Sequence, residues 1–128
     1  MRLARHSALA LFLCMGSPAI AQPAPVITVR MSNFKFAPST IVLDHGRSYV
    51  LHLANIASGG HDFTAAEFFA AANVAPADRY HISDGEVEVP PGRAIDIHLT
   101  APAAGRYKLR CSHSFHKMFG MSGSIVVR

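Results

Sequence analysis

The sequence predicts an all-β domain, an antiparallel sandwich or barrel, on three observations. Apolar and polar residues alternate with a period of two in six or seven short segments. Gly, Pro and Asp residues separate these segments, as turns do in such folds. The length of 128 residues suits a single domain, and 50% hydrophobic with 16% charged residues excludes a disordered chain.

The first expected strands precede residue 54. Residues 26–31 alternate in polarity, and residues 34–36 continue the pattern up to a proline. Residues 41–43 lead into the turn cluster 44–47, which contains Asp and Gly. Residues 49–53 then place Tyr and two Leu side chains on one face. This pattern is typical of short strands with one buried face.

One short helical insert is expected next. Thr64 and Glu67 form a capping-box pattern, and residues 65–72 are rich in good helix formers. Residues 74–85 show no regular period, so we expect an irregular connection there. The two-residue alternation then returns in the remaining expected strands, at residues 86–89, 95–99, 107–111 and 125–127.

Residues 1–21 have the parts of a secretory signal peptide. Two arginines in the first five residues precede an apolar run at residues 8–15, and Ala19-Ile20-Ala21 is a small-x-small cleavage site. The run is shorter than the roughly 20 residues that span a bilayer, so we expect no membrane span in the mature chain. We expect a single periplasmic domain at residues 22–128. Lipid attachment through Cys14 is the alternative.

The residues with metal-binding chemistry gather before the last expected strand. Cys111, His113, His116, Met118 and Met121 lie within eleven residues. The alternation predicts that the Cys111 sulfur points into the core at the end of its strand. Without residues 1–21 it is the one remaining cysteine, and an unpaired thiol in an oxidising compartment calls for burial or a metal. A thiolate, imidazoles and a weak thioether are the ligands of a blue-copper site.

A further imidazole for such a site must come from elsewhere in the chain. His61 is the best candidate, because it follows an expected strand and the pair Gly59-Gly60 and precedes the apolar Phe63. The histidines at positions 45, 52, 81 and 98 are expected to be structural or surface residues.

At these residues the chain resembles the cupredoxins, the family of plastocyanin, azurin, pseudoazurin and rusticyanin. The resemblance covers nearly all of the mature chain and includes residues 33–38, 41–46 and the strand up to Asn55. It implies a Greek-key β-sandwich that binds one copper ion. The ligands it implies are His61, Cys111, His116 and Met121, in a Cys-x4-His-x4-Met spacing similar to that of rusticyanin-like members.

Several alternatives remain at the site. His113 could replace His116 as the ligand, act as an auxiliary or copper-uptake ligand, or be a surface residue, and Met118 offers a second His-x4-Met pairing. Cys111 could be a buried apolar residue, and Met121 could fill the core. Zinc accepts Cys and His ligands, although a methionine argues against it. The proline that the family usually has near this loop is missing.

The resemblance implies a one-electron carrier of the type 1 copper class, with a cytochrome or reductase as redox partner. The alternative is a copper-handling protein for tolerance, buffering or delivery, which would exchange copper with a donor or acceptor protein; the spare donors His113 and Met118 favour it. We expect no enzyme, because a multicopper oxidase needs further histidine clusters. The net charge of +4 comes from scattered residues, so we expect no nucleic-acid partner.

Overall fold

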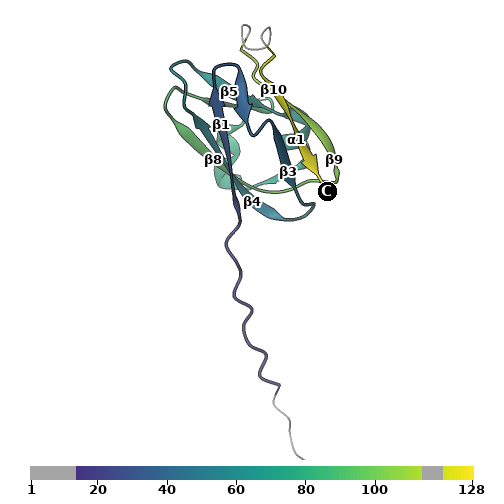
Figure 1. Cartoon of the computed structure of the whole chain (residues 1–128). Coiled ribbons are helices and arrows are strands. Elements are labelled where there is room, and N and C mark those ends of the chain that lie inside the picture. The colour runs from purple at the N-terminus through teal and green to yellow at the C-terminus, as the bar shows by residue number, and fades with distance from the viewer. Residues whose placement is uncertain (1–13, 114–119) are drawn as a thin grey trace, which may run out of the picture.

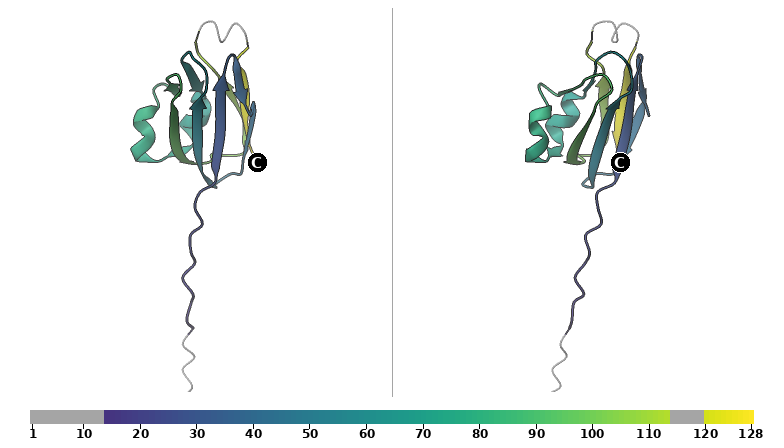
Figure 2. Two further views of the ribbon diagram at one scale, coloured as in Figure 1. Left: turned by 60° about the vertical axis from the view of Figure 1, so that its left-hand side comes forward. Right: turned by 90° about the vertical axis from the view of Figure 1, so that its left-hand side faces the viewer.

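The computed structural model describes residues 14–113 and 120–128, in which two sheets pack face to face (Figures 1 and 2). One sheet has the strand order β2-β1-β4-β8-β6, and the other has the order β3-β10-β9-β5-β7. The elements are, in chain order, β1 (Val26–Ser32), β2 (Lys35–Ala37), β3 (Thr40–Leu43), β4 (Ser48–Asn55), β5 (His61–Thr64), α1 (Ala66–Ala71), β6 (Asn73–Val74), the 3-10 helix η1 (Pro76–His81), β7 (Glu86–Val89), β8 (Ala94–Thr100), β9 (Gly105–Arg110) and β10 (Ser122–Val127). The predicted β-sandwich with a short helical insert is confirmed.

Two strand pairings differ from the expected antiparallel arrangement. Strand β1 pairs with β4, and β3 pairs with β10, in parallel. The chain visits the second sheet at β3 before it returns as β4, and such a crossover is what parallel neighbours require. Polarity alternation reports which face of a strand is buried and carries no information on the direction of its neighbour. The purely antiparallel prediction was therefore wrong at these two pairs.

The helical insert lies at one side of the sandwich (Figure 2). Helix α1 confirms the predicted helix, but the predicted capping box is wrong. The N-cap residue is Ala65, with no side-chain cap, because Thr64 ends β5 and its hydroxyl donates to Asp62 Oδ1 at 2.6 Å. The connection expected to be irregular begins within β6 and contains η1.

The core between the sheets is built from the inward residues of the alternating strands. Strand β4 alternates without a break, and its buried members include Leu51 and Leu53. The ring of Phe63 in β5 lies edge-on to Phe36 at 6.0 Å and to Phe69 of α1 at 5.9 Å. This aromatic contact joins the two sheets and the insert, and it anchors the strand that begins at His61.

Residues 14–25 form an extended segment without helix or strand, which runs away from the sandwich (Figure 1). Within the described ranges, no helix has both the length and the apolar character needed to cross a membrane.

Candidate metal centre

Three of the predicted ligands lie where three adjacent strands begin or end. His61 is the first residue of β5, Cys111 directly follows β9, and Met121 directly precedes β10. These strands are neighbours in one sheet. The amide of Cys111 donates to the carbonyl oxygen of Met121 at 3.0 Å, which continues the β9–β10 register by one pair. Residues far apart in the sequence therefore meet at one end of the sandwich.

The spacing of the His61 and Cys111 side chains suits a shared metal ion. The Nδ1 atom of His61 lies 4.0 Å from the Cys111 Sγ atom, and the two residues are 2% and 0% exposed. An ion at about 2.0 Å from nitrogen and about 2.3 Å from sulfur, with an angle near 120°, separates these atoms by about 3.7 Å. Met121 is 1% exposed beside them. This buried mixture of nitrogen and soft sulfur fits copper.

The surroundings of the sulfur favour a bound cation. Burial raises the pKa of the Cys111 thiol, while backbone hydrogen bonds from Asp62 and His113 lower it. Burial disfavours the thiolate because a charge loses its hydration there. A metal ion reverses this preference, since it binds the thiolate and displaces the proton.

Asp62 joins the two ligand-bearing segments, a role that the sequence analysis missed. Its carboxylate is fully buried and accepts hydrogen bonds from the Ser112 amide at 2.8 Å and the Ser112 hydroxyl at 2.6 Å. The Thr64 hydroxyl donates the third bond. The residue after His61 is thus tied to the residue after Cys111. A charged residue directly after a candidate ligand was the available signal.

Asn55 holds the loop that leads to His61. Its side-chain amide donates to the carbonyl oxygens of Gly59 at 2.8 Å and Val89 at 2.9 Å, and its Oδ1 atom accepts from the Ala57 amide at 2.9 Å. The side chain is 1% exposed and fully bonded, so it fixes the backbone before His61.

His113 faces an acidic surface next to this centre. Its Nε2 atom lies 3.1 Å from Glu88 Oε2 and 3.5 Å from Asp62 Oδ2. Asp62, Cys111 and His113 also offer ligand atoms within 4.8 Å of one another. His116 and Met118 fall outside the described residues, so the assignment of His116 rather than His113 as a ligand stays a prediction.

Three other histidines bond to residues outside the predicted ligand set. His52 binds Asp96 at 2.6 Å, and His98 binds Asp78 at 2.7 Å, both through Nδ1 on exposed strand faces. His45 bonds to the carbonyl oxygen of Pro102.

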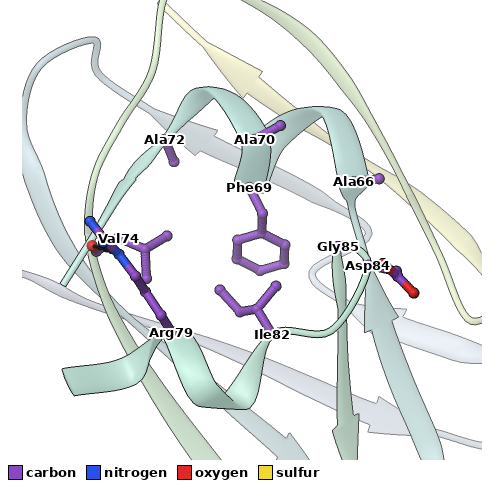
Figure 3. A pocket seen from close by; sticks show the side chains of 9 residues that line it. All are labelled: Ala66, Phe69, Ala70, Ala72, Val74, Arg79, Ile82, Asp84 and Gly85. Atoms are coloured by element: carbon purple, nitrogen blue, oxygen red, sulfur yellow. Dashed lines mark hydrogen bonds between the residues drawn. The ribbon is translucent and has the colours of Figure 1, made fainter. Parts of the chain in front are cut away.

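A cavity of about 510 Å³ lies in the helical insert, separate from the predicted ligands. Phe69 and Ile82 point toward each other across it, with Val74 and Arg79 at one side (Figure 3). None of its lining residues is a predicted metal ligand. The predicted ligands that the structure describes lie at the strand ends instead.

Comparison with known proteins relates the chain to the cupredoxin-like domain family. The sequence model of the cupredoxin-like domain matches residues 5–127. Auracyanin B matches with a TM-score of 0.61 and 19% identity, over 86% of this chain and 93% of that chain. Dithionite-reduced auracyanin from the photosynthetic bacterium Roseiflexus castenholzii matches with a TM-score of 0.61 and 20% identity, over 84% and 99%.

A larger protein shares the same fold. A multicopper oxidase from Campylobacter jejuni matches with a TM-score of 0.62 and 11% identity, over 88% of this chain and 31% of that one. No curated protein matches the sequence. At these identities the solved structures show the fold alone.

Proposed function

Because the chain belongs to the cupredoxin-like domain family, we propose that it binds one copper ion and carries single electrons in the periplasm. The observation that carries this proposal is the 4.0 Å approach of His61 Nδ1 to the buried Cys111 sulfur, with Met121 beside them. The likeness to auracyanins, one of them solved in a dithionite-reduced form, supports a redox role.

We infer that His61, Cys111, His116 and Met121 hold the copper. When bound, copper supplies the one-electron chemistry, because thiolate and imidazole together accommodate both of its oxidation states. The protein keeps water from the sulfur by burying it and directs backbone N–H groups of Asp62 and His113 to it. Such hydrogen bonds and burial tune the potential of a metal site.

A redox partner such as a cytochrome or reductase would dock transiently at the end of the sandwich that bears the site. We propose that residues 1–21 are removed on export, which lowers the net charge from +4 to +2. We expect no enzymatic activity of the domain itself. Multicopper oxidases share the fold, and the chain spans 31% of the one from Campylobacter jejuni.

A copper-handling role, in tolerance, buffering or delivery, is the second candidate. The contact of His113 with Glu88 and Asp62 beside Cys111 favours it, because spare donors next to a site assist ligand exchange with a donor or acceptor protein. An electron carrier should keep its ion through repeated redox cycles. Transfer of copper to an acceptor apoprotein would instead indicate handling.

The test is a visible absorption spectrum of residues 22–128 loaded with Cu(II), followed by reductive titration. We expect an intense thiolate-to-copper band that bleaches and returns reversibly. Cys111→Ser should abolish the band, while His52→Ala, which alters an exposed histidine of β4, should leave it unchanged. An intense band in the Cys111→Ser variant would exclude the proposed ligand, and irreversible bleaching would contradict electron transfer.

A further inference from the structure

We propose that His113, Glu88 and the buried Asp62 form a second site, open to solvent at His113 and Glu88, for a divalent transition-metal ion, Cu²⁺ above all, through which copper reaches Cys111. Metal binding at this site does not depend on the proposed electron-carrier function. The role of the site in copper uptake rests on that proposed function.

The His113 nitrogen lies at the spacing of two ligands of one ion from each of the two carboxylates. His113 Nε2 lies 3.2 Å and 3.1 Å from the two Glu88 carboxylate oxygens and 3.5 Å from Asp62 Oδ2. Ligand atoms at about 2.0–2.1 Å from a metal, with angles of about 90–120°, lie about 2.8–3.6 Å apart. The His113 and Glu88 side chains are 37% and 49% exposed, so an ion can reach them from solvent.

The strand register concentrates negative charge at this point. Asp62 of β5 lies directly opposite Glu88 of β7, and Glu86 is two residues along the same strand. Like charges opposite each other across antiparallel strands destabilise a sheet. Within residues 14–113 and 120–128, no lysine or arginine forms an ion pair with any of these three carboxylates. A bound divalent cation would compensate this charge.

The donor set selects the class of ion. One imidazole with carboxylate oxygens suits divalent first-row metals, among which Cu²⁺ binds most strongly. The site lacks the soft sulfur ligands that Cu(I) prefers, so it differs in preference from the buried centre.

The two groups of donors share members, which gives an ion a route inward. Asp62 and His113 offer ligand atoms within 4.8 Å of each other and of the Cys111 donor, and Asp62 also belongs to a group with Glu86 and Glu88. An ion held at the surface can therefore exchange Glu88 for the Cys111 sulfur while it keeps a contact with His113 or Asp62.

The experiment counts copper ions. Cu²⁺ is titrated into the wild-type domain beyond one equivalent, with electron paramagnetic resonance and calorimetry to resolve a second ion bound by nitrogen and oxygen. We expect His113→Ala or Glu88→Gln to lower the affinity for the second ion by about 10–100-fold or more. Losses of that size are found even for residues that only support a metal ligand. His98→Ala is the matched control, because His98 also binds a carboxylate, that of Asp78, but belongs to no candidate metal-ligand group among the described residues.

Absence of a second ion, equal binding in His113→Ala, or equal loss in His98→Ala would overturn the site. If the protein binds an ion that depends on His113 but shows no thiolate band, the second site is supported and the proposed electron-carrier function is refuted. For uptake, stopped-flow mixing should show a slower rise of the thiolate band in Glu88→Gln with the same final intensity. An unchanged rate would refute the uptake role.

Discussion

The hydrogen bonds of Asp62 lead to a quantitative prediction about the metal-free protein. Asp62→Ala removes a fully buried carboxylate that accepts from the Ser112 amide, the Ser112 hydroxyl and the Thr64 hydroxyl. Hydrogen bonds to charged groups contribute roughly 1.5–3 kcal/mol each, and a buried amide left without an acceptor costs about 1–3 kcal/mol. The mutation also removes the cost of burying a charge, which offsets part of the stability lost with these hydrogen bonds. We expect a loss of about 3 kcal/mol in the free energy of unfolding.

Asp62→Asn should cost much less. Its Oδ1 atom can still accept from Thr64 and from the Ser112 amide. The Ser112 hydroxyl can accept from the new amide and donate to Glu86 Oε2, which already lies 3.0 Å away. One weakened bond is worth about 1 kcal/mol, so the two variants should differ by about 2 kcal/mol.

Urea denaturation of the metal-free, reduced protein measures the free energy of unfolding of both variants, and thermal denaturation measures their Tm. For a domain of this size, about 3 kcal/mol corresponds to a fall in Tm of roughly 12–24 °C. Asp96→Ala is the control, because its exposed pair with His52 should contribute less than about 1 kcal/mol. Equal losses in Asp62→Ala and Asp62→Asn, or a loss in Asp62→Ala no larger than in the control, would refute the role of these hydrogen bonds.

Two further predictions concern the aromatic packing of the sandwich and a charged hydrogen bond between η1 and β8. Phe63→Ala removes a fully buried ring from the contact with Phe36 and Phe69, and calorimetry should show about 3–5 kcal/mol lost; a loss below about 1 kcal/mol would contradict the packing. The backbone hydrogen bond from His98 lowers the pKa of Asp78 below its ordinary value of 3.8. The ionised Asp78 therefore stabilises the folded protein above pH 3.8, and this stabilisation disappears as the pH falls through the lower pKa of the folded state. Asp78→Asn should therefore cost about 1 kcal/mol at pH 7 and nothing near pH 2 in denaturation curves, and an equal cost at both pH values would count against the charged hydrogen bond.

Much of the fold and the chemistry of the site could be predicted from local patterns. Alternation in β4 and β8 identified buried faces because successive side chains of a strand point to opposite sides. The same rule placed the Cys111 sulfur inside, and the structure confirms its burial. The donor types at Cys111 and Met121 suggested copper from their chemistry alone, because soft sulfur selects few metals.

What only the tertiary structure decided are the relations between segments distant in sequence. The parallel pairings of β1 with β4 and of β3 with β10 depend on where the chain crosses between sheets, which polarity does not encode. The pairing of Thr64 with Arg110 brings Asp62 beside Ser112, so a residue that looked like part of a helix cap helps to hold two ligand segments together. The sequence by itself determined which atoms could bind a metal, and the register of β5 against β7 and β9 decided which of them meet, because hydrogen bonding between strands sets those distances.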